Sequence, residues 1–507
     1  MGEKEEGFVK WFSELSNKDI EIAGGKGASL AELYRHKFPI PPGFVVTANA
    51  YKHFIESEGL KNLIHDTLSG LNTENTEDLN AASKKIREAI EKTPLPKDLE
   101  EEIIEAYDVL DVEKHKMSEA SSGALEILRT GHEPPFVAVR SSSTAEDLAE
   151  ASFAGQQESF LNIKGEKFLL DKIRKCFSSL FTPRAIYYRA KKKFKHEDTY
   201  LAVVVQKMID AEKSGVVFSR NPIKKDETIL LEAVWGLGEG IVSGRIKPDT
   251  YRATRDLEKF DILDAKIAEK KIAIVRDSGG NTVPVKLSPE KSKYQVLTTY
   301  EIKRLSQIAL ESEEHYATPQ DIEFAIADKE IYIVQSRPIT TQVIENDNKE
   351  IEGSSILEGL GASPGISAGT VRIIEDLNHL EKVRKGDIIV TQMTNPDMVV
   401  TMQRAAGIVT DEGGVTSHAA IVSREMGIPA VVGTGNATEK LKDGQLVTVD
   451  GNNGRVYEGR GETKSVKINP IVPTKTKIKV NVVVVKMIGN VEEMGLLNVL
   501  NVKVVGI

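Results

Sequence analysis

The chain has 507 residues, with 67 lysines and arginines against 76 aspartates and glutamates, so its formal net charge is −9. This length predicts about three domains, and the mild acidity argues against a nucleic-acid-binding protein, whose surface must neutralise phosphates. The single cysteine, Cys176, allows no internal disulfide and no thiolate metal cluster, and its apolar neighbours favour a small buried side chain.

The first residues of the chain are charged and include no apolar core, so we do not expect them to form a signal peptide. The apolar runs, such as 201–205 and 482–485, are too short to span a bilayer. We therefore expect a cytoplasmic protein with no membrane partner.

Helical and strand patterns alternate along the chain. Residues 26–37 follow a glycine turn and are predicted to be helical, and residues 80–110 and 171–192 have apolar side chains at helical spacing. Short β-branched runs bounded by turn residues predict strands at 136–140, 201–208, 215–218 and 229–234. This mixture predicts a multidomain protein of α/β and α+β folds.

A glycine-rich turn with a lysine precedes the first of these helices. It reads Gly24-Gly25-Lys26-Gly27, and it is not a Walker A loop because a glycine rather than Ser or Thr follows Lys26. The glycines would let a phosphate approach the backbone, and Lys26 would offset its charge. An ordinary surface turn would have the same sequence.

A second candidate segment runs Val137-Ala-Val-Arg140-Ser-Ser-Ser-Thr-Ala-Glu-Asp147. We expect the strand to end at Arg140 and a hydroxyl-rich loop to follow. The planar donor fork of Arg140 suits a phosphate, and the hydroxyls add further donors. A solvated Ser/Thr loop is the alternative, but it would not need an arginine at the end of the strand.

A predicted hairpin supplies a row of polar side chains. If its loop is Asp328-Lys329-Glu330, then Ala327 pairs with Ile331. Counting outward with period two places Glu323 opposite Gln335 and Asp321 opposite Arg337, all on one face. Ile322, Phe324 and Ile326 would bury the other face. Two carboxylates, an amide oxygen and an arginine suit a Mg²⁺–polyphosphate site, although a solvated hairpin face would also be polar.

Segment 407–429 is the most informative. We expect a strand, a turn and then a helix with Thr416 or Ser417 as N-cap and Gly427 just beyond its C-terminal end. His418 then falls in the first helical turn, where the helix dipole disfavours an imidazolium and would stabilise an attached phosphoryl group. A neutral, nucleophilic histidine is predicted, with a capping or core histidine as the alternative.

Two longer segments resemble the motifs of one particular enzyme family. Gly413-Gly-Val-Thr-Ser-His418-Ala-Ala-Ile-Val-Ser-Arg-Glu-Met-Gly427 resembles the phosphohistidine signature of phosphoenolpyruvate-utilising enzymes, and Gly361-Ala-Ser-Pro-Gly-Ile-Ser-Ala-Gly369 resembles the start of their swivelling domain. With the segments described above, the chain resembles the phosphoenolpyruvate synthase (pyruvate, water dikinase) family from about Trp11 to about Tyr457.

The resemblance implies a domain order. Residues 1–342 would form an ATP-grasp nucleotide-binding domain, and the polar, unpatterned residues 343–356 a linker. Residues 357–462 would form a swivelling β/β/α phosphohistidine domain. Residues 463–507 would be a second linker and the truncated start of a barrel that binds pyruvate and phosphoenolpyruvate.

The resemblance also implies roles for single residues. Lys26 and Arg140 match residues that hold the phosphates of ATP, and Arg337 matches a phosphate contact. Gly155, Ser159 and Gln206 match the lining of the nucleotide pocket. Glu323 and Gln335 match the ligands of Mg²⁺, and His418 matches the histidine that accepts the phosphoryl group.

The implied reaction converts ATP, pyruvate and water into AMP, phosphate and phosphoenolpyruvate. A barrel needs about 200 residues or more, so we expect the last transfer to need a barrel from a partner chain or another source, and a homo-oligomer stays possible. A truncated ATP-binding protein without turnover is one alternative. A rifampicin phosphotransferase-like enzyme is another, disfavoured because only the short linker separates the two domains. Pyruvate, phosphate dikinase is a third.

Overall fold

The computed structural model describes residues 7–73, 75–110, 134–144, 158–191, 194–196, 199–222, 227–339, 341–342, 354–461 and 469–470. Gly155, most of the predicted linker at 343–356 and nearly all of the predicted barrel start at 463–507 lie outside these residues. In the part of the chain that is described, no helix combines the length and apolar composition needed to cross a membrane.

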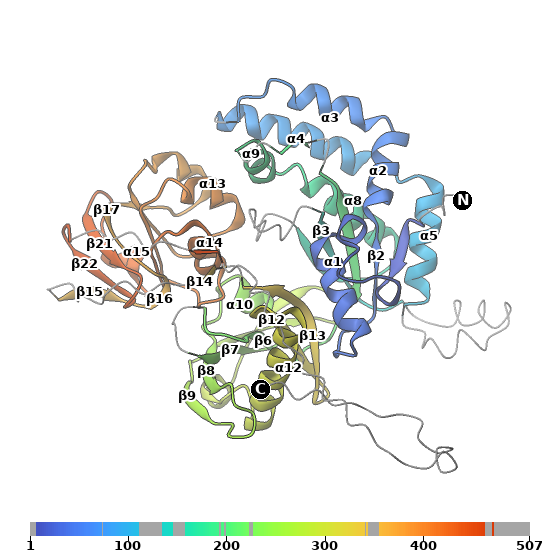
Figure 1. Ribbon diagram of the computed structural model, residues 1–507. Coiled ribbons are helices and arrows are strands. Elements are labelled where there is room, and N and C mark those ends of the chain that lie inside the picture. The colour runs from blue at the N-terminus through green and yellow to red at the C-terminus, as the bar shows by residue number, and fades with distance from the viewer. Residues whose placement is uncertain are drawn as a thin grey trace, which may run out of the picture. The chain divides into compact units, whose positions relative to one another are not determined.

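An antiparallel sheet organises the first part of the chain (Figure 1). Its strand order is β1-β2-β5-β3-β4, with β1 Val9–Trp11, β2 Gly43–Val46, β3 Val137–Ser143, β4 Ser159–Ile163 and β5 Leu201–Lys207. The helices of this part are η1 Phe12–Glu14, α1 Ile20–Arg35, α2 Ala48–Ser57, α3 Leu60–Leu68, α4 Thr76–Lys92, α5 Lys97–Asp108, α8 Glu166–Ser179 and α9 Pro183–Lys191.

Prolines divide two of the predicted helical regions. Pro94 and Pro96 separate α4 from α5, and Pro183 begins α9 after α8 has ended. Proline lacks the backbone N–H that a helix interior needs, so it stands at or outside the first turn. Cys176, on α8, is buried as expected.

Strand β5 is buried on both faces. Val203 and Val205 belong to a core formed with α2, α4, α5 and α8, whereas Ala202 and Val204 belong to a second core formed with α1. Alternate side chains of a strand point to opposite faces of the sheet. This double burial explains why the strand reads as a continuous apolar run.

A second antiparallel sheet shares the core that contains α1. Its order is β13-β12-β6-β7-β8-β9, with β6 Lys213–Phe218, β7 Thr228–Trp235, β8 Asp249–Thr254, β9 Ile262–Lys266, β12 Gln320–Ala327 and β13 Glu330–Pro338. Nearby elements are α10 Glu239–Val242, β10 Ile272–Arg276, β11 Thr282–Lys286, α11 Pro289–Lys293 and α12 Thr299–Tyr316. Helix α12 begins with a capping box formed by Thr298 and Glu301, and it lies against β12 and β6 (Figure 1).

The hairpin β12–β13 differs from its prediction at the turn. The loop has two residues, Asp328 and Lys329, both with positive φ (52° and 65°) as in a type I′ turn, so Ala327 pairs with Glu330 rather than Ile331. A β-bulge at Val334 then restores the register, and Glu323 lies opposite Gln335 as predicted. The pairing of Asp321 with Arg337 is likewise confirmed.

The third sheet, which has eight strands, is parallel at its centre. Its order is β15-β22-β21-β17-β18-β19-β20-β16, and the pairs β17–β18, β18–β19 and β19–β20 are parallel. The strands are β15 Ser355–Glu358, β16 Leu360–Ser363, β17 Ile366–Ile373, β18 Ile388–Thr391, β19 Gly407–Thr410, β20 Ala430–Val432, β21 Leu446–Asp450 and β22 Arg455–Glu458. Its helices are η3 Leu377–Lys382, η4 Pro396–Met398, α13 Val399–Met402, α14 His418–Met426 and α15 Ala437–Lys440.

Separate apolar cores cover the two faces of the central parallel strands. Ile389 and Ile408 belong to one core, with Ala420 of α14, and Val390 and Val409 belong to the other. A two-stranded pairing of β14 Thr341–Gln342 with β23 Asn469–Pro470 completes the described strands. The chain is therefore a multidomain protein of mixed α and β structure, as the sequence predicts.

Candidate functional site

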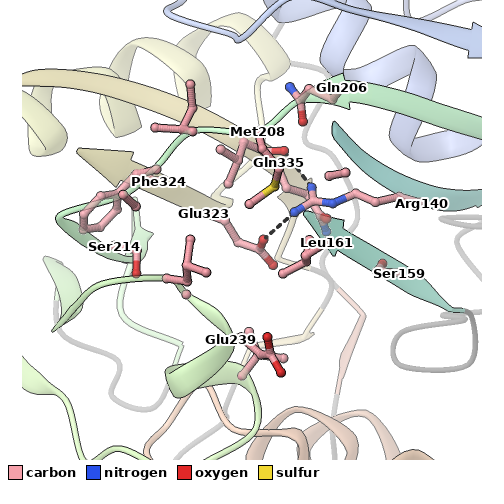
Figure 2. A pocket seen from close by; sticks show the side chains of 18 of the residues that line it. Arg140, Ser159, Leu161, Gln206, Met208, Ser214, Glu239, Glu323, Phe324 and Gln335 are labelled. Atoms are coloured by element: carbon pink, nitrogen blue, oxygen red, sulfur yellow. Dashed lines mark hydrogen bonds and ion pairs between the residues drawn. The ribbon is translucent and has the colours of Figure 1, made fainter. Parts of the chain in front are cut away.

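A cavity of about 580 Å³ is lined by both antiparallel sheets and by α10. Apolar side chains in its lining include Phe160, Met208, Ile209, Leu237, Ile241 and Val242. Polar side chains include Arg140, Ser159, Gln206, Glu239, Glu323 and Gln335. Figure 2 shows Arg140 and Glu323 pointing toward each other across this space. A concave, mostly apolar site with a few convergent polar groups is the usual form of a small-molecule site.

Arg140 connects the two sheets near Glu323 and Gln335, and these three side chains mark the polar end of the cavity. Its Nη1 donates a hydrogen bond to the carbonyl oxygen of Val334 at 2.9 Å, and its Nη2 lies 3.9 Å from Oε2 of Glu323 (Figure 2). Glu323 and Gln335 are a cross-strand pair on β12 and β13. One guanidinium, one carboxylate and one amide therefore face the same space.

The prediction that the strand ends at Arg140 is wrong. Strand β3 continues through Ser143, because residues 137–143 all pair with β5. Ser141, Ser142 and Ser143 are buried, so they are not part of a solvated loop. Arg140 is thus held within a central strand, which restricts its backbone more than a loop would.

The glycine turn before Lys26 packs against the end of β3. Gly24 has φ 66° and breaks the helical geometry of α1, and a side chain there would collide with the carbonyl oxygen of Ser142. The Ser142 hydroxyl accepts a hydrogen bond from Gly27 N–H at 3.1 Å. Lys26 follows this close contact but is not among the side chains that line the cavity.

Arg337 also lies outside the lining of the cavity, and it is paired with a carboxylate. Its Nε and Nη2 each lie 2.9 Å from Oδ2 of Asp321. Burial works against the charge of Arg337, but Asp321, together with Glu425 and Glu323, outweighs it and raises the pKa of the guanidinium. Of the four polar side chains predicted to share one hairpin face, Glu323 and Gln335 line the cavity.

The remaining predicted lining residues fall on neighbouring strands. Ser159 is exposed on β4 and lies opposite Arg140 in the sheet, and Gln206 is buried on β5. Lys172 on α8 and Glu239 on α10 also line the cavity, although neither was among the predicted site residues. Their helical segments carry no periodicity that distinguishes a cavity-lining charge from a solvated one.

His418 is the first residue of α14, as predicted. Ser417 is the N-cap, and its hydroxyl accepts a hydrogen bond from Ala420 N–H at 3.5 Å. Gly427, with φ 67°, ends the helix. Thr416, the other candidate for the N-cap, instead donates its hydroxyl to Glu232.

Among the described residues, the imidazole of His418 has a hydrogen-bond partner at only one of its two nitrogens. Its Nδ1 lies 2.8 Å from the hydroxyl of Thr394, and its Nε2 is buried without a hydrogen-bond partner among the described residues. Burial lowers the pKa of His418 to about 4, and the positive charge of Arg184 adds to the shift. The ring is therefore neutral at pH 7, as predicted from its position at a helix start, with burial as the main cause.

The segment before His418 packs on the six-stranded sheet. Glu232, fully buried on β7, accepts hydrogen bonds from Val415 N–H at 3.2 Å and from the Thr416 hydroxyl. The Val415 side chain shares an apolar cluster with Phe218 and Leu230. Burial raises the pKa of Glu232, although these hydrogen bonds favour its charged form. The sequence did not indicate that Glu232 contacts this segment.

Helix α9 supplies further contacts to the part of the chain that contains His418. Arg184 Nη1 lies 3.2 Å from Oδ1 of Asp397, and Lys191 donates to Oε1 of Gln403 at 2.8 Å. Arg184 is buried, whereas the side chain of Asp397 is exposed.

Two models of known protein families match this chain, one over its earlier part and one over its later part. Residues 20–356 match the model described as "Pyruvate phosphate dikinase, AMP/ATP-binding domain", and residues 383–454 match "PEP-utilising enzyme, mobile domain". The chain belongs to this family of phosphoenolpyruvate-utilising enzymes. The resemblance inferred from the sequence is thereby confirmed.

Relatives in this family are named phosphoenolpyruvate synthases. A probable phosphoenolpyruvate synthase of Archaeoglobus fulgidus is 51% identical over 94% of this chain and 62% of its own length. A second, of Methanothermobacter thermautotrophicus, is 46% identical over 95% of this chain and 69% of its own. The phosphoenolpyruvate synthase of Pyrococcus furiosus is 45% identical over 89% of this chain and 59% of its own. The chain thus spans about three fifths to two thirds of the length of these relatives.

Proposed function

We propose that this chain transfers a phosphoryl group from MgATP to His418 and is the ATP-dependent part of a phosphoenolpyruvate synthase reaction. Residues 1–342 would be an ATP-grasp domain, 343–356 a linker and 357–462 a swivelling phosphohistidine domain, followed by the start of a barrel. The observation that carries the proposal is the cavity with Arg140 and Glu323 at its polar end, together with the neutral His418 at a helix start.

The purine of ATP would pack on apolar side chains of the cavity, and its phosphates would lie near Arg140 and Glu323. Met208, Leu237 and Ile241 present apolar surface suited to a flat ring. Arg140 offers Nη2 to a phosphate while Nη1 stays bound to the Val334 carbonyl. Lys26 and Arg337 would add positive charge if closure of the site brought them to the phosphates, and Gly155, Ser159 and Gln206 would complete the pocket.

Glu323 and Gln335 would hold Mg²⁺. Carboxylate and amide oxygens on one face of a hairpin are ligands of the kind that this ion takes alongside phosphate oxygens. When bound, Mg²⁺ neutralises charge on the phosphate oxygens. Asp321 is committed to Arg337, so it would support the site from outside rather than bind the ion.

His418 would act as the nucleophile through Nε2. If Nδ1–H donates to the Thr394 hydroxyl, the lone pair is on Nε2, the nitrogen without a hydrogen-bond partner among the described residues. This nitrogen would attack the β-phosphorus of ATP, and the bond from that phosphorus to the oxygen bridging to the α-phosphate would break, releasing AMP. Water would then remove the γ-phosphate as inorganic phosphate and leave a phosphoryl group on His418.

Pyruvate is the proposed final acceptor, because the relatives are named for phosphoenolpyruvate. The phosphoryl group would pass from His418 to the enolate oxygen of pyruvate, which regenerates the neutral imidazole. Binding of pyruvate and phosphoenolpyruvate would belong to a barrel of the kind that the family contains. A partner chain or a homo-oligomer is compatible with this scheme.

Labelled ATP tests the proposal directly. With ATP labelled at the β-phosphate, the protein should gain an acid-labile, base-stable label that is absent from His418→Ala. His379→Ala, which removes another histidine of the same sheet region, is the matched control and should keep the label. Label that persists in His418→Ala would exclude this residue as the carrier. Label from the γ-phosphate alone would indicate a simple kinase step instead.

A further inference from the structure

Two helix ends, distant from His418 in the sequence, bring three metal-ligating side chains together. Glu32 and His36 are one helical turn apart at the end of α1, and His315 lies in the last turn of α12. Among the residues that the structure describes, this is the one group of three His, Cys, Asp or Glu side chains whose potential ligand atoms all lie within 4.8 Å of one another.

The separations between these atoms fit a single small cation. Nε2 of His315 lies 2.9 Å from Oε1 of Glu32, and Nδ1 of His36 lies 3.6 Å from the same oxygen. Ligands about 2.0–2.1 Å from a tetrahedral Zn²⁺ are about 3.3 Å apart. The two separations lie on either side of that value, and the third, between Nδ1 of His36 and Nε2 of His315, is no more than 4.8 Å, so rotation of the side chains could bring all three atoms around one ion.

The carboxylate of Glu32 is already oriented by the backbone. Its Oε2 accepts a hydrogen bond from Asn17 N–H at 3.0 Å, which leaves Oε1 for the two histidines. A hydrogen bond of this kind, which orients a ligand through an atom that does not bind the metal, is typical of metal sites.

His36 can give up its present hydrogen bond without leaving a carbonyl unpaired. Its Nδ1 lies 2.9 Å from the carbonyl oxygen of Glu32, and the backbone N–H of His36 donates to the same oxygen at 3.1 Å. Replacing the Nδ1 proton by a metal ion therefore keeps that oxygen hydrogen-bonded. The His36 side chain is about half exposed, which gives an ion access from solvent.

We propose that Glu32, His36 and His315 bind one Zn²⁺ ion, with water as the fourth ligand. Two imidazole nitrogens and one carboxylate oxygen are a ligand set for Zn²⁺ and similar transition metals, whereas Mg²⁺ prefers oxygen ligands alone. The site is therefore distinct in chemistry from a Mg²⁺–nucleotide site. It does not depend on the function proposed above.

Such an ion would cross-link two helices that support the cavity. Helix α1 contains the glycine turn with Lys26 and contacts β3 and β5, and α12 packs on β12, which contains Glu323. The ion would bind the folded chain and not the unfolded one, so it should stabilise the folded state by mass action. A role in stability rather than in phosphoryl transfer follows from this position.

Metal binding to the whole chain, stripped of metal by a chelator, tests the proposal. We expect one Zn²⁺ per chain by calorimetry, a rise in the melting temperature on adding Zn²⁺, and the visible absorption of tetrahedral Co²⁺ when Co²⁺ is used instead. His36→Ala and His315→Ala should each lose the Co²⁺ spectrum and the rise in melting temperature. His53→Ala is the matched control, because His53 also pairs with a carboxylate, Asp98, at 3.1 Å.

Two results would overturn the site. One is a wild-type chain that shows no saturable Zn²⁺ binding. The other is binding with unchanged stoichiometry and affinity in both His36→Ala and His315→Ala, which would place the ion on other histidines of the chain. Circular dichroism of each variant without metal identifies any loss that is due to unfolding, and Glu32→Gln, which keeps an oxygen for Asn17 N–H, offers a further variant that should bind more weakly.

Discussion

Arg140 donates a hydrogen bond from Nη1 to the carbonyl oxygen of Val334 at 2.9 Å, and this bond joins β3 of one antiparallel sheet to β13 of the other. Val334 is the extra residue of the β-bulge, so its backbone lies outside the regular strand register. The carbonyl oxygen of Val334 is therefore available to accept a hydrogen bond from Arg140. Because Nη1 is held in this way, Nη2 is directed toward Glu323 at the polar end of the cavity.

The first prediction concerns the metal–phosphate end of the cavity. Glu323→Gln removes one negative charge from the proposed Mg²⁺ site with little change in shape, so affinity for MgATP should fall about tenfold or more, equivalent to about 1.4 kcal/mol. Isothermal calorimetry with and without Mg²⁺ measures this. Glu330→Gln, an exposed acid at the turn of the same hairpin, is the control and should bind as the wild type does. Equal affinity in Glu323→Gln would remove the metal assignment.

The second prediction concerns the hydroxyl that holds His418. Thr394→Val removes the partner of Nδ1 while keeping the side-chain volume, so the tautomer with the lone pair on Nε2 is no longer favoured. The initial rate of His418 labelling should fall about fivefold to tenfold, the equivalent of a hydrogen bond of about 1 kcal/mol. Affinity for ATP should stay the same. Thr370→Val, on β17 of the same sheet, is the control, and an unchanged rate in Thr394→Val would exclude the positioning role.

The third prediction is a pH dependence. The pKa of His418 is lowered to about 4 by burial and by Arg184, so the ring stays neutral well below the usual histidine range. The labelling rate should therefore be level from pH 8 to about pH 5 and fall only toward pH 4, whereas an ordinary histidine would lose half its neutral form near pH 6.5. Arg184→Gln should move the fall to higher pH. A midpoint near pH 6.5 in the wild type would contradict the buried setting.

The same shift has a consequence for stability. Between about pH 6.5 and about pH 4 the unfolded chain protonates His418 while the folded chain does not. Since the unfolded state then binds more protons, this residue makes the folded state less stable as the pH falls through that window. His418→Ala should reduce that part of the pH dependence of unfolding.

The fourth prediction concerns the buried carboxylate beneath the His418 segment. Glu232→Ala leaves Val415 N–H and the Thr416 hydroxyl without their acceptor, which should cost about 1–3 kcal/mol of stability in urea unfolding. Labelling of His418 should slow while ATP affinity remains, because Glu232 does not line the cavity. Glu258→Ala, an exposed acid, is the control. Normal labelling by Glu232→Ala would mean that this contact does not position the histidine.

Local sequence determined the features that depend on neighbouring residues. The start of α14 at His418 follows from the Ser417 cap and the Gly427 stop, since both act within one helical turn of the residues they affect. The alternation of Ile322, Phe324 and Ile326 with polar residues likewise predicted which face of β12 is buried, and all three side chains are buried. The family was also evident from the sequence, because the His418 segment is long and specific.

Tertiary structure decided what depends on partners distant in the chain. The hairpin, although local, was also not fully predicted: a two-residue turn shifts the pairing by one position, and the bulge at Val334 restores it before Glu323, so the predicted pair was right although the predicted turn was wrong. Arg140 lies within a strand rather than at its end because β5, some sixty residues later, pairs with Ser141–Ser143. The burial of His418 and the contact of Glu232 with Thr416 arise in the same way. Such contacts join segments with no local pattern in common, and packing alone brings them together.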